Sequence, residues 1–320
     1  MKFWAFALYF TVLLGFVTKV NAQITGASCP ESAQYYSKDS INVITFGAST
    51  VEGVNGFSFQ PHLTSNFLKC YPSKTINIQK YGISGETTGD GLLRINNAIK
   101  NKTGFIAILM GANDAVQIAA GKLSVVETEA NMRELIRRSL QQKLIPIICT
   151  IQNFDDRKST QFKRVNYYVT KINIIYKNLA KEYGIYLADI NAVMQRDFAL
   201  YQDYVHPNAR GNRLISFVLF DTINKIIAAK FLKFIVTQNY PNPGKESTSI
   251  DIIMPEADKI EFKLYNLQGK VIQTILNEYL NTGKHTIELS LRLLPAGVYI
   301  YRVASSNGLY TTSKKMVIMH

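Results

Sequence analysis

A serine, a histidine and an aspartate stand in short strings whose residue types suit acyl transfer. Ser49 follows Gly47 and Ala48, and Asp203 stands three residues before His206 in the string Asp-Tyr-Val-His-Pro. A serine hydroxyl is a poor nucleophile at neutral pH, so it needs a base within hydrogen-bond reach and a third group that orients the base. We therefore expect Ser49 to attack, His206 to carry the proton and Asp203 to orient the imidazole.

Donors for a developing negative charge stand in two further strings. Asn113, in Gly-Ala-Asn, offers a side-chain amide, and Gly85, in Ser-Gly, offers a backbone N–H that a ligand can reach without meeting a Cβ. Preorganised donors of this kind are each worth roughly 10²–10³ in rate. We expect these two groups and the N–H of Ser49 to form an oxyanion hole.

The proline after His206 predicts the local geometry of the base. A residue before proline is driven into extended backbone, and proline is favoured as the first residue of a helix. We expect His206 to lie in a fixed pose at a helix entrance. A tight turn would then bring the Asp203 carboxylate back to the imidazole.

Other acidic and basic residues compete for these roles. Asp189 and Asp197 are alternatives to Asp203 as the orienting acid, but neither has its spacing to His206. His62 is an alternative base, although apolar residues recur around it at helical spacing and favour a helix residue there: Phe59, Leu63 and Phe67.

Apolar runs and helical periodicity indicate the elements that position these residues. Strands are predicted at 41–46, 105–110, 145–150 and 185–188, with helices at 125–142 and 167–183 between them. This alternation predicts an α/β domain with a doubly wound, flavodoxin-like parallel sheet and helices on both faces. Ser49 and Asn113 follow the ends of two strands, where open parallel sheets bind their ligands.

Because of these four strings, residues 41–228 resemble the SGNH hydrolases, also called GDSL-type esterases and lipases. All four family blocks occur in the family's order. The resemblance implies that Ser49 is the nucleophile, that Gly85 and Asn113 are oxyanion donors, and that Asp203 and His206 complete the triad.

Two details qualify the resemblance. Ile-Ser-Gly-Glu-Thr-Thr at 83–88 is similar to the second block of the thioesterase and lysophospholipase branch, which favours Gly85 over Gly82 as the donor. The first block usually reads Gly-Asp-Ser, whereas Ala48 replaces the aspartate here. That aspartate is not the family's triad acid, so the expected chemistry is unaffected, but the bracing of the nucleophile loop is left open.

The first 22 residues have the pattern of a secretory signal peptide. Lys2 precedes an apolar run at 3–17, and small residues precede a cleavage point after Ala22. An uncleaved membrane anchor is the alternative, but this run is shorter than the roughly 20 residues that span a bilayer.

Three cysteines fit an exported chain that does not depend on a disulfide framework. Cys29 and Cys70 form one possible bridge, and Cys149 lies in an apolar run as expected for a buried thiol; the pairing stays open. Four histidines and the absence of metal-ligand spacing lead us to expect no metal and no cofactor.

After about residue 230 the pattern changes. Residues 231–243 are proline-punctuated and predict a linker, and alternation at 250–254, 260–265, 286–291 and 298–303 predicts a small β-sandwich over 244–320. Asn-Tyr-Pro-Asn-Pro at 239–243, Leu-Tyr-Asn-Leu-Gln-Gly at 264–269, Leu-Pro-Ala-Gly-Val-Tyr at 294–299 and Lys-Lys-Met-Val-Ile at 314–318 resemble the C-terminal sorting domain of the type IX secretion system of Bacteroidota. The resemblance implies the secretion machinery as a partner, with passage across the outer membrane. A carbohydrate-binding or adhesive sandwich that stays attached is the alternative.

The chain carries a strongly positive net charge, which bears on its expected partners. The net charge of +13 is spread along the chain without a nucleic-acid motif, so we expect no nucleic-acid partner and consider anionic polysaccharide or lipopolysaccharide instead. We predict a signal peptide at 1–22, a hydrolase domain at 23–230, the linker and the sandwich. The predicted function is a secreted serine esterase that hydrolyses carboxylic esters through an acyl-enzyme, with short-chain acyl (acetyl) esters of carbohydrates as the expected substrates. The substrate partner is therefore a small-molecule or polysaccharide ester. Lysophospholipase or thioesterase activity, and a non-catalytic surface-binding module, are the alternatives; attachment to the outer membrane or release stays open.

Overall fold

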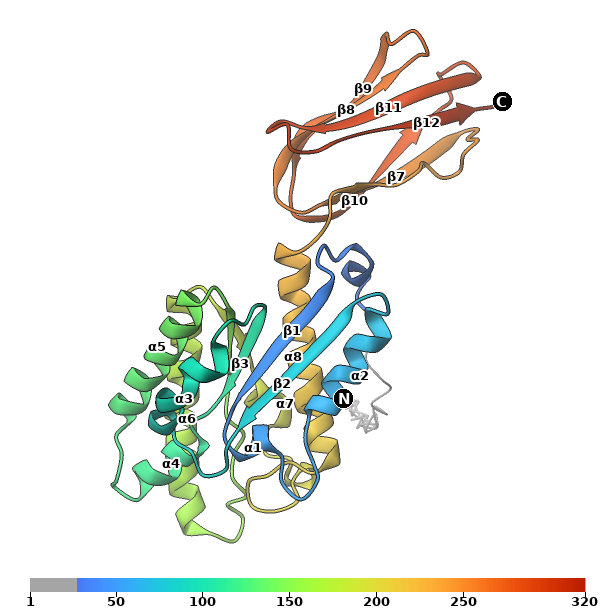
Figure 1. The fold of residues 1–320 in the computed structure, drawn as a ribbon. Coiled ribbons are helices and arrows are strands. Elements are labelled where there is room, and N and C mark those ends of the chain that lie inside the picture. Colours follow the sequence, from blue (N-terminus) through green and yellow to red (C-terminus); the bar gives the residue numbers. More distant parts are fainter. Residues whose placement is uncertain (1–27, 320) are drawn as a thin grey trace, which may run out of the picture.

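The first domain is built on one parallel sheet. The computed structural model describes residues 28–319, so the predicted signal peptide lies outside the described residues. The strand order β2-β1-β3-β4-β5 is the flavodoxin-like order, which confirms the predicted fold class (Figure 1). The strands are β1 (Ser40–Gly47), β2 (Thr75–Gly82), β3 (Phe105–Leu109), β4 (Ile145–Cys149) and β5 (Tyr186–Ala188).

Four of these strands match the predicted apolar runs, whereas β2 was not predicted. It is an edge strand that pairs only with β1, and it alternates partly buried residues with exposed ones such as Asn77 and Lys80. An edge position needs no continuous apolar run, which explains why the sequence pattern misses it.

Helices cover both faces of the sheet, as predicted (Figure 1). On one face lie α3 (Thr88–Ile99), α4 (Ala112–Ala119), α5 (Val125–Gln141) and α6 (Thr160–Glu182). On the other lie the 3₁₀ helix η1 (Glu31–Tyr35), α2 (Gln60–Cys70), α7 (Ile190–Met194) and α8 (Ala209–Lys230). The short helix α1 (Ser49–Glu52) follows β1, and the 3₁₀ helix η2 (Phe198–Leu200) precedes the His206 segment. The predicted helix at 167–183 is α6, which begins earlier because Ser159 caps it by accepting from the N–H of Phe162.

Two apolar cores hold these layers together. Val43 on β1 belongs to the core shared with α2 and α8, whereas its neighbour Ile44 belongs to the core shared with α3, α5 and α6. Successive strand residues point to opposite faces, so a central strand must be apolar on both sides. The mostly apolar sequence of β1, with residues such as Ile41, Val43, Ile44 and Phe46 buried, follows from this requirement.

A second, all-β domain follows α8 and confirms the predicted sandwich. Its sheets have the orders β10-β7-β6 and β12-β11-β8-β9, with an apolar core between them. The strands are β6 (Ile235–Val236), β7 (Ser247–Met254), β8 (Asp258–Tyr265), β9 (Val271–Leu280), β10 (Gly283–Ser290), β11 (Gly297–Ser305) and β12 (Thr311–Ile318). Strand β6 pairs with β7, so residues 235–236 of the predicted linker join the sandwich.

The Asn-Tyr-Pro-Asn-Pro string is bonded to the sandwich through its first asparagine. Asn239 is 2% exposed, and its side-chain amide donates to the Thr248 hydroxyl at 2.9 Å and to the Pro241 carbonyl at 3.1 Å. Its backbone N–H donates to the Tyr301 hydroxyl at 3.1 Å. The conformation of this string is thus tied to strands β7 and β11.

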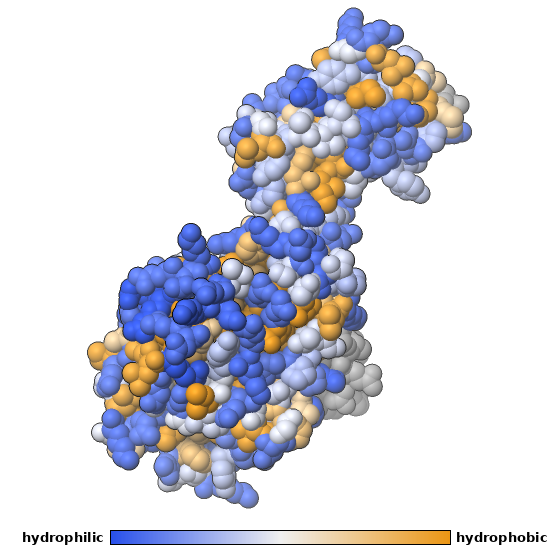
Figure 2. All heavy atoms as spheres, viewed as in Figure 1, coloured by the Kyte–Doolittle hydropathy of each residue, from blue (hydrophilic) through white to orange (hydrophobic). Residues whose placement is uncertain are grey.

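The two domains join where the chain leaves α8. The Ser37 N–H donates to the Phe231 carbonyl at 2.8 Å, and the Lys233 N–H donates to the Tyr35 carbonyl at 2.9 Å. Lys284 of β10 also forms an ion pair with Glu31 at 2.6 Å. Figure 2 shows the two lobes meeting at this narrow waist. Within the described residues, no helix is both long and apolar enough to cross a bilayer.

A disulfide anchors the segment that contacts the second domain. Cys29 and Cys70 are bonded, whereas Cys149 is a buried free thiol whose pKa is raised by burial. The bond ties the start of the described chain to the end of α2, across a sequence separation of 41 residues.

Replacing both bonded cysteines by serine is expected to lower the free energy of unfolding by about 2–4 kcal/mol, because the cross-link restricts the unfolded chain. Urea denaturation of the oxidised wild type and of the C29S/C70S variant measures this difference. Dithiothreitol should destabilise the wild type but not the double variant. Equal midpoints for the two oxidised proteins would contradict the prediction.

Candidate active site

The nucleophile candidate lies at the carboxyl end of β1, an interior strand of the sheet. Ser49 is the first residue of α1, two residues after the strand ends at Gly47. A Cβ on Gly47 would lie 2.3 Å from the Leu109 carbonyl oxygen, so only glycine permits this close approach of β1 and β3. The pairing register of β1 with β3, which sets the position of Ser49 along the sheet, therefore depends on Gly47.

The three predicted triad residues lie in contact. His206 Nε2 is 2.9 Å from Ser49 Oγ, and His206 Nδ1 is 2.7 Å from Asp203 Oδ2. The side chains of His206 and Asp203 are 22% and 38% exposed, so a substrate in solution can reach them. This arrangement gives a hydroxyl, an imidazole and a carboxylate in one hydrogen-bonded line.

A tight turn holds the acid of this line. Asp203 Oδ1 accepts from the backbone N–H groups of Val205 at 2.9 Å and His206 at 2.7 Å. Partial burial opposes ionisation of Asp203, but these N–H donors and the imidazole outweigh it, so the pKa of the carboxyl is lowered. Asp203 is therefore a carboxylate that accepts from the ring at neutral pH.

The helix after the base begins later than predicted. Pro207 is not its first residue: Pro207 forms an isolated β-bridge with Tyr201, and α8 begins at Ala209. Asn208 is the N-cap, and its side chain accepts from the N–H groups of Arg210 and Gly211. An asparagine that satisfies two free N–H groups is a stronger helix start than a proline that only fits the backbone.

Asn113, the candidate amide donor, lies just after the end of β3, the strand that pairs with β1. Gly111 is left-handed at φ +116°, and a Cβ there would lie 2.6 Å from the Tyr176 hydroxyl, so the turn into α4 requires glycine. Asn113 follows in the first turn of α4, and its Nδ2 donates to the Glu86 carbonyl at 2.8 Å. An amide nitrogen carries two hydrogens, so one remains for a ligand.

The two candidate glycines of the second block differ in their surroundings. A Cβ on Gly82 would lie 2.1 Å from the Glu52 nitrogen, so Gly82 serves the packing of β2 against α1. Gly85 has φ +83° and open space where a Cβ would be. The open space beside Gly85 is consistent with a ligand close to its backbone, whereas Gly82 is packed against α1.

The competing residues hold other parts of the chain. Asp189 forms an ion pair with Lys177 at 2.7 Å and caps α7, and Asp197 caps η2. His62 lies within α2, as its flanking apolar residues predicted. The structure brings none of the three into the hydrogen-bonded line.

Two glutamines tie the nucleophile segment to the base segment. Gln152 is 1% exposed, and its Nε2 donates to Thr50 Oγ1 at 3.1 Å and to the Val205 carbonyl at 3.2 Å. Gln202 Nε2 donates to the Val54 carbonyl at 3.2 Å. Sequence reasoning missed both, since an isolated glutamine carries no motif; only the position of Gln152 just after β4 hinted at the site.

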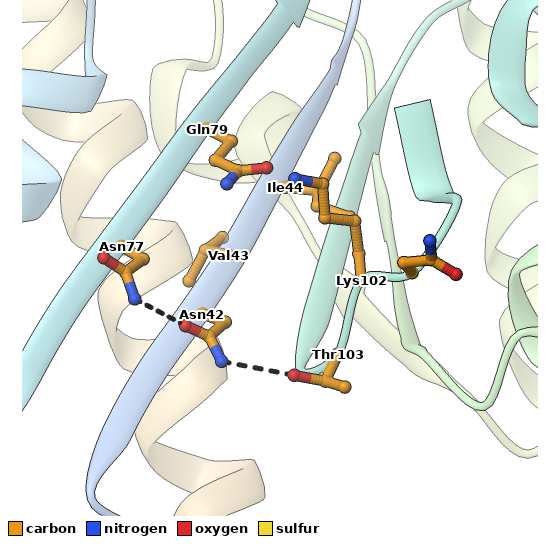
Figure 3. A pocket seen from close by; sticks show the side chains of 8 residues that line it. Asn42, Val43, Ile44, Asn77, Gln79, Lys102 and Thr103 are labelled. Atoms are coloured by element: carbon orange, nitrogen blue, oxygen red, sulfur yellow. Dashed lines mark hydrogen bonds between the residues drawn. The ribbon is translucent and has the colours of Figure 1, made fainter. Parts of the chain in front are cut away.

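A polar hollow at the opposite end of the sheet is separate from this site. Figure 3 shows Asn77 and Thr103 on either side of Asn42, joined to it by hydrogen bonds of 2.8 and 3.3 Å. The cavity measures about 180 Å³ and lies near the start of β1 and β2, not near their carboxyl ends. It lies at the opposite end of the strands from Ser49, so it takes no part in the chemistry there.

Two segments of the chain match known protein families. Residues 45–214 match the GDSL-like lipase/acylhydrolase family, which is more than half of the chain. The chain therefore belongs to this family and is a hydrolase that acts on ester bonds. Residues 238–319 match the secretion system C-terminal sorting domain, which supports export by the type IX system to the cell surface or beyond.

Solved structures share the fold of the hydrolase domain. Axe2, an acetylxylan esterase from Geobacillus stearothermophilus, is 20% identical, with 59% of this chain and 95% of that chain covered and a TM-score of 0.49. A variant of Axe2, described as an acetyl-xylooligosaccharide esterase, has the same identity and coverage and a TM-score of 0.50. A G-D-S-L family member from Veillonella parvula is 19% identical, covers 58% of this chain and 99% of that chain, and has a TM-score of 0.48. No curated protein sequence matches the chain.

Proposed function

We propose that Ser49, His206 and Asp203 are the catalytic triad and that the enzyme hydrolyses short acyl esters of carbohydrates through an acyl-enzyme. The observation that carries the proposal is the continuous line from Ser49 Oγ to His206 Nε2 at 2.9 Å and from Nδ1 to Asp203 at 2.7 Å. With Asp203 ionised, the proton of the neutral ring lies on Nδ1. Nε2 is then free to accept the serine proton.

The proposed reaction has two matching halves. Ser49 Oγ attacks the ester carbonyl as its proton passes to His206 Nε2, and the carbonyl oxygen becomes an oxyanion. Donors at Ser49 N, Gly85 N and Asn113 Nδ2 stabilise that charge. When the intermediate collapses, His206 returns the proton to the leaving alcohol. Water then attacks the acyl-serine by the same path, and carboxylate is released.

An exposed tyrosine supports a carbohydrate on the alcohol side. Tyr204 stands between Asp203 and His206, and its side chain is 60% exposed. Its ring lies 5.3 Å from that of Phe162, which in turn lies 5.5 Å from Phe154. The Tyr204 carbonyl accepts from the Asp155 N–H at 2.7 Å. A supported, solvent-facing aromatic ring beside the base offers a flat surface to the C–H face of a sugar.

The likeness to the Axe2 variant shows a shared fold and not a shared substrate, but the activity of that esterase suggests a substrate to test. We therefore choose acetylated xylo-oligosaccharides as the sugar ester. The sorting domain is consistent with this choice, because an exported enzyme can reach polymers outside the cell.

Serine replacement tests the nucleophile. S49A is expected to lower kcat on p-nitrophenyl acetate at least 10⁴-fold and to abolish labelling by a fluorophosphonate probe, because the nucleophilic oxygen is gone. S65A, at an exposed serine of α2, is the matched control and should behave as the wild type. Unchanged turnover in S49A would refute the assignment. An unlabelled, inactive wild type would favour a non-catalytic binding module.

Tyrosine replacement and a chain-length series test the substrate. Y204A is expected to raise KM for acetylated xylo-oligosaccharide about 3- to 10-fold, as aromatic contacts of 0.5–1.5 kcal/mol imply, and to leave ethyl acetate hydrolysis unchanged. Y279A, at a 75% exposed tyrosine of β9, is the matched control. An equal effect on both esters would contradict a sugar contact.

Acyl length separates sugar deacetylation from the lipid and thioester alternatives. We expect kcat/KM on p-nitrophenyl esters to fall steeply beyond butyryl, because the proposed substrates carry short acyl groups. Esters from acetyl to palmitoyl provide the series. Rates that rise towards palmitoyl would instead support a lysophospholipase or thioesterase.

A further inference from the structure

Arg94 lies behind the oxyanion donors and contacts none of the triad residues. It belongs to α3, its side chain is 19% exposed, and its guanidinium lies 4.3 Å from the centre of the Phe46 ring. Arginine carries five N–H donors in a rigid fork, so one side chain can hold several acceptors in fixed relation.

The fork of Arg94 joins three segments at the carboxyl edge of the sheet. Nη2 donates to the Gly47 carbonyl at 2.9 Å, at the end of β1, and Nη1 donates to the Tyr81 carbonyl at 3.2 Å, near the end of β2. Nε donates to the Glu86 carboxylate at 2.7 Å, in the loop that carries Gly85. One cation thus spans the strand before Ser49 and the loop of a proposed oxyanion donor.

Glu86 extends this contact to the second donor. Its side chain is 15% exposed and pairs with Arg94, while its backbone carbonyl accepts from Asn113 Nδ2 at 2.8 Å. That bond uses one amide hydrogen of Asn113 and thereby aims the other. Because Glu86 also adjoins Gly85, the position of this one residue sets the relative placement of both donors.

The departure at Ala48 increases the need for such bracing. Ala48 is the N-cap of α1 and makes no side-chain capping bond. The carbonyl that Arg94 holds belongs to Gly47, the residue just before it. Support for the start of the nucleophile helix therefore comes from a neighbouring helix.

We propose that Arg94, acting through Glu86, is a positioning residue that holds the Gly85 and Asn113 donors in the geometry that stabilises the oxyanion. The inference rests on the proposed function of the triad. An oxyanion hole acts only when its donors are already in place, and small misplacements cost roughly 10- to 100-fold in rate. Loss of Arg94 should therefore reduce kcat and spare substrate binding.

The experiment compares full-length R94Q, R94K and E86Q with the wild type on p-nitrophenyl acetate. R94Q is expected to lower kcat 10- to 100-fold with KM within threefold, and to weaken binding of a tetrahedral boronate inhibitor by the same factor. R94K, which keeps the charge but not the fork, and E86Q, which keeps the acceptor, should lose less. The matched control is R138Q: Arg138 likewise pairs with a carboxylate, that of Glu134, and donates to a backbone carbonyl at 2.8 Å, but away from the site.

A double-mutant cycle with N113A tests the route of the effect. Residues that act as one unit are not additive, so R94Q should cost clearly less in the N113A background than in the wild type, and the cost that remains acts through Gly85. Additive losses, or equal kcat losses in R94Q and R138Q, would overturn the proposal. If R94Q does not fold, R94K and E86Q carry the same comparison. The R94Q/E86Q variant controls for an unpaired carboxylate beside the site, and full recovery of kcat in it would also overturn the proposal. Failure of the wild type itself to turn over esters or to react with the fluorophosphonate would refute the proposed function instead.

Discussion

The parallel register of three adjacent strands is the constraint on which the site depends. Gly47 of β1 pairs with Gly82 of β2 and with Leu109 of β3, so the three strands end at one level. Ser49, the Gly85 loop and the Asn113 turn therefore follow neighbouring strand ends and lie close together, although they are far apart in sequence. A shift of one residue in either pairing would move a donor by about 3.3 Å, more than an oxyanion hole tolerates.

Much of this arrangement could be predicted from the sequence because chemistry and fold leave their signals in the same places. Buried parallel strands must be apolar on both faces, so β3 and β4 are visible as continuous runs, and β1 as a run that only Asn42 and Thr45 interrupt. The polar residues that interrupt such runs at their carboxyl ends are then conspicuous. Asp203 and His206 are only three residues apart, so the turn that joins them can be predicted from neighbouring residues alone.

The remainder depends on contacts between segments that no string encodes. Strand β2 is an edge strand without fully buried residues, and β9 is mostly exposed, so neither strand is marked by an apolar run. The start of α8 was misplaced because Asn208 satisfies free N–H groups that Pro207 cannot. Gln152 and Arg94 stand alone in sequence, and their roles follow only from the carbonyls that folding brings to them.

The length of α8 has a consequence for how an exported enzyme meets its surroundings. This 22-residue helix begins beside the base and ends at the waist, which separates the two by roughly 33 Å (Figure 1). The sorting domain thus lies at the opposite end of the molecule from the proposed triad. If that domain is held on an envelope, the proposed active site faces outward to the medium, and removal of the tail would leave it equally exposed.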